Sequence, residues 1–368
     1  MSSREPQTMS DSNNNHEIPA YRVLQEAVSE AASSARAVRI VGGDSKHFYG
    51  REPTGDPLSV SECRGIVNYQ PTELVITARA GTPLSELEDS LAQRGQMLGF
   101  EPPAFGATAT LGGTIACALS GPRRPYLGAA RDFVLGVKLL NGKSEILRFG
   151  GEVMKNVAGY DLSRLLTGSL GTLGIILEVS LKVLPRPLLE RTLCFSLDQA
   201  GAIDTVNRWS GRPLPFSASA FDGERLLVRL SGTESGVEAA ARELGGEPLE
   251  SGGVFWSALN EQTLPFFQRP GSLWRLSVPS TAPPLALPGQ WFLEWGGAQR
   301  WLRSEAPAVA IREAASAVAG HATLFRGGDR QGDVFQPLPP ALLDLHRRLK
   351  QGFDPAGIFN PGRLYPEF

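Results

Sequence analysis

The sequence predicts an α+β protein with two folded domains, and three observations lead to this expectation. The chain has 368 residues, more than the ~250–300 at which a single core usually stops growing. Short strand-like and helix-like segments alternate along most of its length. Glycine clusters in the first half, since residues 42–174 hold 21 of the 41 glycines, whereas all six tryptophans lie between residues 209 and 301.

In the first half, strands are expected at residues 38–41, 74–78, 133–140, 144–149 and 175–183. Thr82 fits an N-cap before Pro83, and Leu84, Leu87 and Leu91 follow at helical spacing. Asn141-Gly142 predicts a hairpin turn between two of the strands. The Pro-Arg-Pro stretch at residues 185–187 is interpreted as the domain boundary.

The second half is interpreted as a separate set of strands and helices. Strands are expected at residues 193–197, 216–221, 225–230, 273–278 and 291–295, with a hairpin turn at Asp222-Gly223. Helices are expected at residues 199–209, 236–244 and 309–319. The predicted organisation is a disordered tail at 1–17, a first domain at 18–187, a smaller α+β domain at 188–328 and a C-terminal segment at 329–368. The tryptophans form either the core of the smaller domain or a partner surface.

Composition excludes several functional classes. Lys and Arg total 36 against 38 for Asp and Glu, so the basic excess of a general nucleic-acid binder is missing. The cysteines, Cys63, Cys117 and Cys194, are odd in number and far apart, which favours a reducing compartment over a disulfide framework or a metal cluster. No run approaches the ~18 apolar residues of a membrane span, and residues 1–17 lack a signal-type segment, so a cytoplasmic protein is expected.

Three glycine-rich motifs indicate a backbone that approaches a ligand closely. The first follows a strand and can form a concave nest of N–H groups for a phosphate or diphosphate: Val41-Gly42-Gly43-Asp44-Ser45-Lys46. The second is Thr108-Ala109-Thr110-Leu111-Gly112-Gly113-Thr114-Ile115. The third is Gly159-Tyr160-Asp161-Leu162 with Gly168-Ser169-Leu170-Gly171-Thr172-Leu173-Gly174-Ile175-Ile176. An ordinary turn or a small-residue core is the competing interpretation of each motif.

Taken in order, these motifs resemble the FAD-binding domain of the vanillyl-alcohol oxidase (PCMH-type) flavoproteins over about residues 18–187, and Asn360-Pro361-Gly362 resembles that family's returning tail. Within the family, Phe100-Glu101-Pro102-Pro103, Gly121-Pro122-Arg123-Arg124 and the stretch from Val153 to Leu162 are similar to the FAD-binding subunits of bacterial glycolate oxidases. The resemblance implies a PCMH-type FAD-binding domain of two α/β subdomains, with a smaller α+β cap domain over the flavin.

The resemblance also implies which residues hold FAD. Residues 42–46 and 110–115 would cradle the diphosphate, residues 171–176 would contact the adenosine half, and the tail near Asn360 would close over the flavin end. Lys46 and Arg131 are candidate neutralisers of the diphosphate charge. The full expected set is Val41, Gly42, Gly43, Asp44, Ser45, Lys46, Pro103, Thr110, Leu111, Gly112, Gly113, Ile115, Ser120, Gly121, Arg131, Asp132, Gly168, Gly171, Thr172, Gly174, Ile175, Ile176 and Asn360.

Two departures from the family pattern concern the chemistry. Members with a covalent flavin carry a histidine in the first glycine loop, where this chain has Asp44 and places His47 three residues later, so non-covalent FAD is expected. Members that oxidise 2-hydroxy acids carry a His-x-Gly-Asp-Gly-Asn-x-His stretch, of which only His321 has a counterpart here. No metal site and no catalytic base is therefore assigned, although Tyr126, Arg326 and Asp329 are conceivable bases.

The expected function is a non-covalent FAD-binding subunit of a multi-subunit glycolate (2-hydroxy acid) oxidase or dehydrogenase, inactive alone. The implied partners are a larger, homologous FAD-containing catalytic subunit and an iron–sulfur subunit, and the complex could touch the inner membrane peripherally. A self-sufficient FAD-dependent 2-hydroxy-acid dehydrogenase and a cofactor-free assembly subunit that retains the fold remain alternatives. Arg123-Arg124 is expected in a solvated loop, with steering of an anionic substrate as the second possibility.

Overall fold

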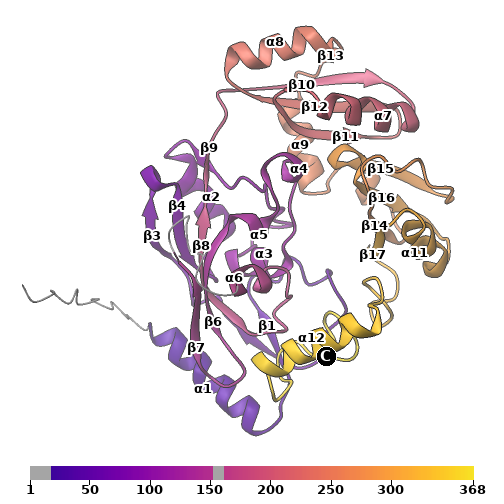
Figure 1. The fold of residues 1–368 in the computed structure, drawn as a ribbon. Coiled ribbons are helices and arrows are strands. Elements are labelled where there is room, and N and C mark those ends of the chain that lie inside the picture. Colours follow the sequence, from indigo (N-terminus) through magenta and orange to yellow (C-terminus); the bar gives the residue numbers. More distant parts are fainter. Residues whose placement is uncertain (1–17, 152–160) are drawn as a thin grey trace, which may run out of the picture.

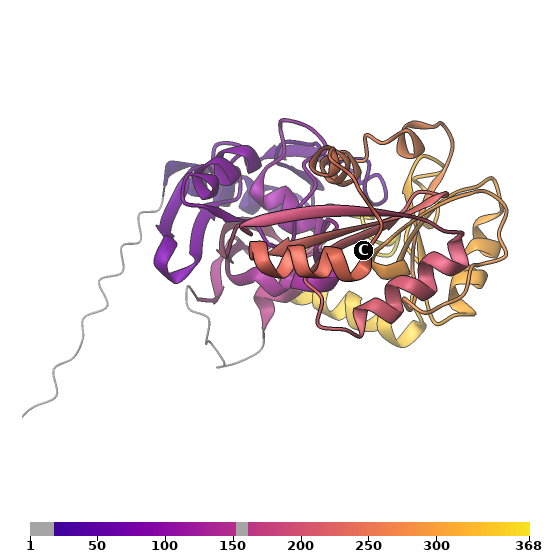
Figure 2. The same ribbon diagram turned by 90° about the horizontal axis from the view of Figure 1, so that it is seen from above.

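The computed structural model describes residues 18–151 and 161–368. It has two lobes side by side (Figures 1 and 2), and the chain returns to the first lobe at its C-terminal end. We call residues 18–185 together with 340–368 the base lobe, and residues 189–326 the cap lobe. The predicted tail at 1–17 and the motif residues 153–160 lie outside the described residues. The predicted boundaries after residues 187 and 328 stay predictions, and the α+β class is confirmed.

The base lobe contains helices, strands and one 3-10 turn: α1 (Pro19–Ser33), β1 (Val38–Val41), β2 (Asp56–Ser59), β3 (Ile66–Gln70), η1 (Pro71–Glu73), β4 (Val75–Arg79), α2 (Leu84–Ala92), β5 (Gln96–Met97), α3 (Leu111–Cys117), α4 (Arg124–Leu127), α5 (Ala130–Phe133), β6 (Val134–Leu140), β7 (Ile146–Gly150), α6 (Leu162–Leu166), β8 (Ile175–Lys182), β9 (Leu184–Pro185) and α12 (Pro340–Phe353). Strands β5 and β9 form a short antiparallel pair.

The first subdomain of the base lobe is a small parallel pair, β1 with β2. The C-terminal tail adds a bridge from Phe359 to Val38, so the two ends of the described chain meet here. Helix α1 covers the pair because Tyr21, Leu24 and Val28 fall on one face at helical spacing and are all buried. This core positions the loop that follows β1.

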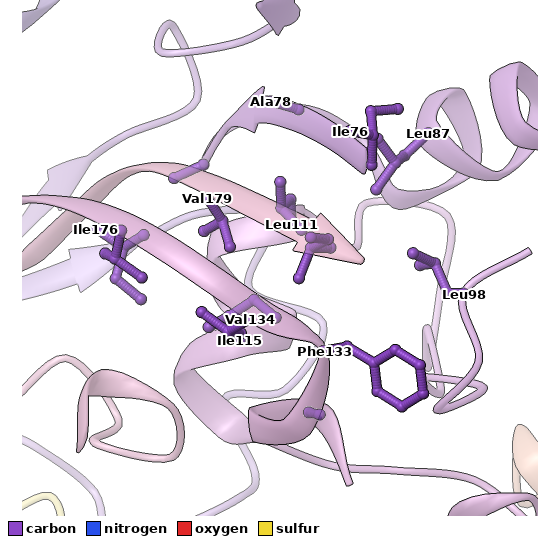
Figure 3. Close-up of a cluster of buried hydrophobic side chains, with 14 of the residues drawn as sticks. Ile76, Ala78, Leu87, Leu98, Leu111, Ile115, Phe133, Val134, Ile176 and Val179 are labelled. Carbon is purple, nitrogen blue, oxygen red and sulfur yellow. The ribbon is translucent and has the colours of Figure 1, made fainter. Parts of the chain in front are cut away.

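The second subdomain is an antiparallel sheet in the order β3-β4-β8-β6-β7. The predicted hairpin is present, with β6 paired to β7 across the Asn141 turn. Helices α2 and α3 pack on one face of the sheet, and Figure 3 shows their apolar side chains meeting those of the strands. Leu87, Leu111 and Ile115 are fully buried there. Burial of this kind contributes roughly 1.5–3 kcal/mol per large apolar side chain, so the core holds α3 rigidly in place.

The cap lobe contains β10 (Leu189–Ser196), α7 (Gln199–Ser210), β11 (Phe216–Phe221), β12 (Arg225–Gly232), α8 (Glu234–Leu244), β13 (Glu247–Pro248), α9 (Gly252–Asn260), α10 (Pro265–Gln268), β14 (Leu273–Ser277), β15 (Gln290–Glu294), η2 (Trp295–Gly297), β16 (Gln299–Arg303), α11 (Ala308–Ser316) and β17 (His321–Arg326). Its strands form one sheet in the order β13-β10-β12-β11-β15-β16-β14-β17, and the strand pairs are antiparallel.

The tryptophans serve mainly as core of the cap lobe. Trp256, Trp274 and Trp301 are at most 4% exposed. Trp301 also meets the ring of Phe325 edge-on, with the two centroids 4.8 Å apart. Side chains this deeply buried cannot form a partner surface.

One local expectation was wrong, and one inner strand was not expected. Thr82 does not cap α2, because its hydroxyl accepts a hydrogen bond from the backbone N–H of Gly65 at 2.9 Å instead, and the helix begins at Leu84. The sequence did not suggest β16, because its Gln-Arg-Trp-Leu-Arg pattern looks too polar for an inner strand. Arg300 is nevertheless completely buried, since backbone carbonyls of Gly297, Pro283 and Ala282 accept its N–H groups.

Candidate functional site

A cleft lies in the base lobe where the loop after β1, helix α3 and the C-terminal tail meet. We call it the β1 cleft. Eight of the predicted cofactor-binding residues line it: Gly42, Gly43, Asp44, Ser45, Lys46, Thr110, Gly113 and Asn360. Its other lining residues are Arg39, Ile40, His47, Pro53, Ala116, Cys117, Leu170 and Arg363. Tertiary structure thus brings residues of all three glycine-rich motifs and of the C-terminal tail to one cleft.

The glycines after β1 allow two loops to touch through their main chains. A Cβ placed on Gly43 would lie 1.4 Å from the carbonyl oxygen of Thr108, and one on Gly42 would lie 2.6 Å from the hydroxyl of Thr110. The Thr108 hydroxyl also donates to the Gly43 carbonyl at 2.5 Å. Part of the glycine requirement therefore comes from packing of protein against protein, and the cleft lies beside that contact.

The loop after β1 keeps main-chain donors available. Among the described residues, the backbone N–H groups of residues 43–46 donate no hydrogen bond to the protein. Asp44 has a φ of +55°, and residues 43–46 line the cleft. A left-handed residue of this kind can turn successive N–H groups toward one side of a loop. Lys46 is buried, Gly43 and Ser45 are half-buried and Asp44 is exposed, so the loop has free N–H donors for a group that carries acceptor oxygens.

The charges around the cleft suit a diphosphate. Lys46 is 6% exposed, its Nζ donates to the carbonyl of Ala104 at 3.0 Å, and burial lowers its pKa. Arg363 donates to the carbonyl of His47 at 2.9 Å, and burial likewise lowers its pKa. Arg39 pairs with Asp44 at 3.5 Å. Three cationic side chains and one carboxylate therefore line the cleft, which leaves it net positive for an anionic ligand.

Helix α3 contributes less to the cleft than the sequence suggested. Thr110 is its N-cap and accepts from the N–H of Gly113 at 3.3 Å. The N–H groups of Leu111 and Gly112 are used within the protein, bonding the carbonyls of Thr82 and Ala80. Leu111 and Ile115 are buried in the sheet core, and a Cβ on Gly112 would meet Ala80 at 2.6 Å. Only Thr110 and Gly113 of this predicted group line the cleft.

The third glycine motif mainly packs against the elements that form the cleft. A Cβ on Gly171 would lie 2.7 Å from the Asn360 side-chain nitrogen, so this glycine makes room for the tail. Gly168 donates to the carbonyl of Ile115, and the Thr172 hydroxyl donates to that of Ser169. The remaining members of the group lie in the core rather than at the cleft: Gly174, against Leu140, with Ile175 and Ile176.

The C-terminal tail is locked onto the cleft through Asn360. Its side chain accepts from the backbone N–H of Ile40 at 2.8 Å and donates to the carbonyl of Leu170 at 2.7 Å. Behind it, the buried Lys350 donates to Asp354 at 2.7 Å and to the carbonyl of Phe359 at 2.8 Å. The tail therefore joins the ends of β1 and of the third glycine motif.

The other predicted residues lie elsewhere. Val41 ends β1 and accepts from the N–H of Val60. Pro103, Ser120 and Gly121 line a second pocket, which lies between the base lobe and the cap lobe. Arg131 is 67% exposed in its side chain, and Asp132 caps α5 by accepting from the N–H of Ala129, so the structure does not bring this pair to the β1 cleft.

Arg39, Cys117 and Arg363 line the cleft, although they were not among the residues predicted to do so. Arg363 follows Asn360-Pro361-Gly362 directly, and its position next to that motif was an available signal. Cys117 lies one helical turn after Gly113, on the same face of α3. Burial raises the pKa of the Cys117 thiol, so it stays protonated near neutral pH.

Arg123 also needs a correction, because it is neither solvated nor free to steer a ligand. Its side chain is 5% exposed and pairs with Glu101 at 2.8 Å and with Glu190. Arg124 lies over the ring of Trp295, 4.4 Å from its centroid. Both arginines connect the base lobe to the cap lobe.

The described residues contain no group of three or more His, Cys, Asp or Glu side chains that could hold a metal ion. Within the same part of the chain, no helix is long and apolar enough to cross a membrane.

The comparisons with known proteins agree with this geometry. Residues 21–150 match the family model of the FAD binding domain, and residues 332–364 match that of the C-terminal domain of FAD linked oxidases. The chain is 51% identical to glycolate oxidase subunit GlcE of Escherichia coli (strain K12), over 94% of this chain and 97% of that protein. It is 26% identical to glycolate oxidase subunit GlcD of Bacillus subtilis (strain 168), over 61% of this chain and 51% of that protein.

Solved structures show the same fold at low identity. P-cresol methylhydroxylase with substrate bound superposes with a TM-score of 0.70 at 15% identity, covering 95% of this chain and 88% of that one. Alkyldihydroxyacetonephosphate synthase superposes with a TM-score of 0.62 at 16% identity, covering 92% and 74%.

The two-lobed fold, the cleft and the matched domains define a flavoprotein of the FAD-linked oxidoreductase class, with a PCMH-type FAD-binding domain. Over nearly its whole length, the chain belongs to the family of glycolate oxidase subunit GlcE.

Proposed function

We propose that this chain is the non-covalent FAD-binding subunit of a multi-subunit glycolate oxidase, with substrate oxidation on a larger flavin subunit related to GlcD. The observation that carries the proposal is the β1 cleft, with its unused N–H groups at residues 43–46 and its excess of cations. Bound FAD supplies a two-electron acceptor that can pass its electrons on singly. The complex includes an iron–sulfur subunit as the next electron acceptor, and it is cytoplasmic or peripheral at the inner membrane.

The chain's own residues would bind and orient the cofactor. The loop at residues 43–46 would donate N–H groups to the diphosphate, and Lys46 and Arg363 would offset its charge. Asn360 would hold the tail against the cleft, because it already bonds Ile40 and Leu170.

The nucleophiles at the cleft support non-covalent binding. The His47 ring nitrogen Nδ1 lies 3.0 Å from the carbonyl oxygen of Asp44, which ties up that nitrogen. The raised pKa of Cys117 keeps its thiol in the protonated, weakly nucleophilic form. Precipitating the purified chain with acid should release all its flavin into the supernatant, and flavin that stays with the pellet would contradict the non-covalent assignment.

The proposal that glycolate is oxidised on the larger subunit and not on this chain is tested by spectroscopy on the full chain purified alone. We expect a yellow protein whose oxidised flavin spectrum does not bleach when glycolate is added without oxygen. Addition of the larger flavin subunit and the iron–sulfur subunit should then restore glycolate-dependent electron transfer. Bleaching of the isolated chain would instead establish the self-sufficient dehydrogenase, and a colourless chain that cannot be loaded with FAD would establish the assembly subunit.

A further inference from the structure

A surface groove runs between helix α2 of the base lobe and helix α9 of the cap lobe, and we call it the α2–α9 groove. It has a volume of about 560 Å³. Figure 1 shows the two helices on their separate lobes. Six lining residues come from these helices, and none of the six lines the β1 cleft or the pocket at Pro103: Glu88, Asp89, Ala92, Gly253, Trp256 and Ser257.

Two arginines and two glutamates that line the groove balance one another. Arg123 and Arg229 pair with the Glu101 carboxylate at 2.8 Å and 2.9 Å. Arg123 also pairs with Glu190. These four side chains therefore leave little free charge for a partner.

The α2 side of the groove carries carboxylates without partners. Among the described residues, Glu88 and Asp89 form no ion pair and no side-chain hydrogen bond, and α2 has no basic residue. The remaining lining cation is Arg186, whose Nε donates to the carbonyl of Gln96 at 3.2 Å. Loss of hydration, followed by repulsion from Glu261 and Asp89, raises the pKa of Glu88 to about 7. A cation brought by a partner would relieve both effects.

The α9 side and the link between the lobes carry exposed apolar side chains. Leu188 and Val254 are the two most exposed large apolar side chains of the described residues, at 79% and 72%. Leu188 follows the lining residue Pro187. Val254 follows Gly253 and lies one helical turn before Ser257, and both of these line the groove. Apolar surface next to a groove is typical of a protein interaction site.

We propose that the α2–α9 groove is the docking site for the larger flavin subunit, through a segment that carries Lys or Arg beside apolar side chains. The basic side chains would meet Glu88 and Asp89, and the apolar ones would cover Leu188 and Val254. An iron–sulfur subunit is less favoured here, because thiolate-bound clusters add negative charge opposite an acidic helix. The inference rests on the proposed function and deepens it, since it names the surface that one partner contacts.

The test measures binding of the full FAD-loaded chain to the purified larger flavin subunit by biolayer interferometry. Val254→Glu should weaken binding roughly 10- to 100-fold, because a carboxylate would replace an apolar contact in the interface. Leu188→Glu should act in the same direction from a different element, so the result does not depend on the folding of one variant. FAD content and melting temperature of both variants should match those of the parent chain.

Helix α11 offers matched controls. Val309 is 60% exposed on α11 and does not line the groove, so Val309→Glu should bind like the parent chain. Glu88→Lys should slow association, and added salt should reduce its difference from the parent chain. Glu313 on α11 is also exposed and forms none of the described ion pairs, so Glu313→Lys should leave the association rate unchanged.

The outcomes separate the docking site from the proposed function. Parent-like binding by both Val254→Glu and Leu188→Glu overturns the docking site and leaves the proposed function standing. Failure of the parent chain to bind the larger flavin subunit overturns the multi-subunit assembly, and the docking site with it. If the variants keep the larger flavin subunit but lose the iron–sulfur subunit or self-association of this chain, the groove has another occupant and the proposal is wrong.

Discussion

The side chain and the backbone of Arg123 are both bonded to the Glu101 carboxylate: its Nε donates at 2.8 Å and its backbone N–H at 3.0 Å. Arg229 of the cap-lobe strand β12 donates to the same carboxylate at 2.9 Å. Glu190 at the start of the cap lobe accepts from Arg123 as well. This ion network joins the base-lobe motifs at residues 100–103 and 121–124 to the cap lobe, and it holds the two lobes together at this point.

Replacing Glu101 by Gln should destabilise the chain strongly. Arg123 and Arg229 are 5% and 6% exposed in their side chains, so the loss of their shared carboxylate leaves buried positive charge. We expect a loss of about 3–5 kcal/mol in the free energy of unfolding, measured with urea. Asp344→Asn, which removes an exposed pair with Arg348, is the control and should change it by less than ~1 kcal/mol. Equal effects of the two substitutions would contradict a structural role for the network.

Gly43→Ala should prevent the loop after β1 from reaching its position. The added Cβ would lie 1.4 Å from a backbone oxygen of Thr108, which a side-chain movement cannot relieve. We expect a lower melting temperature and less FAD bound per chain. Gly253→Ala, in helix α9 with no atom within 4 Å of the added Cβ, should leave both unchanged or raise stability by up to ~1 kcal/mol. Normal FAD content in the Gly43 variant would argue against the assigned cofactor loop.

Asn360→Ala should loosen the tail from the β1 cleft. The substitution removes the bonds to Ile40 and Leu170, each worth about 1 kcal/mol, and leaves their backbone groups without partners. We expect weaker FAD binding, seen as faster flavin loss on dilution and gel filtration. Asn207→Ala, which removes amide-to-carbonyl bonds inside the cap lobe, should destabilise the chain without changing FAD retention in the folded protein. If the two variants lose flavin equally fast, the tail does not contribute to the cleft.

Glu294 should make stability depend on pH. Its folded pKa of about 7 lies above its ordinary value of 4.5, so the stabilisation by the protonated form is complete below 4.5 and is lost as pH rises through about 7. The full difference is at most about 3 kcal/mol. Glu294→Gln should therefore flatten the decline of unfolding free energy between these pH values. Every other titrating carboxylate is present in both proteins, so its contribution to the slope cancels in the comparison. An unchanged slope in the variant would show that Glu294 ionises freely.

Several parts of the fold and the site were predictable from local sequence. The helical spacing of Leu84, Leu87 and Leu91 predicted the buried face of α2, although the start of that helix was misassigned at Thr82. The glycine loop after β1 was found because glycine is costly unless the backbone requires it. Residues such as Ile115 and Ile176 were assigned to the cofactor by motif alone, and the structure places them in the core of the sheet.

Sequence by itself determined many of the strands and the glycine loops, because hydrophobic periodicity and backbone freedom act over a few neighbouring residues. The returning tail was implied by the family resemblance. Tertiary structure decided which of those residues share a space. Arg363 reaches the loop at residues 46–47 across more than 300 positions, and Arg123 and Arg229 share the carboxylate of Glu101. Arg275 and Glu294 line one pocket between the lobes. The physical reason is that burial and charge pairing depend on three-dimensional packing, which brings together side chains that no local pattern connects.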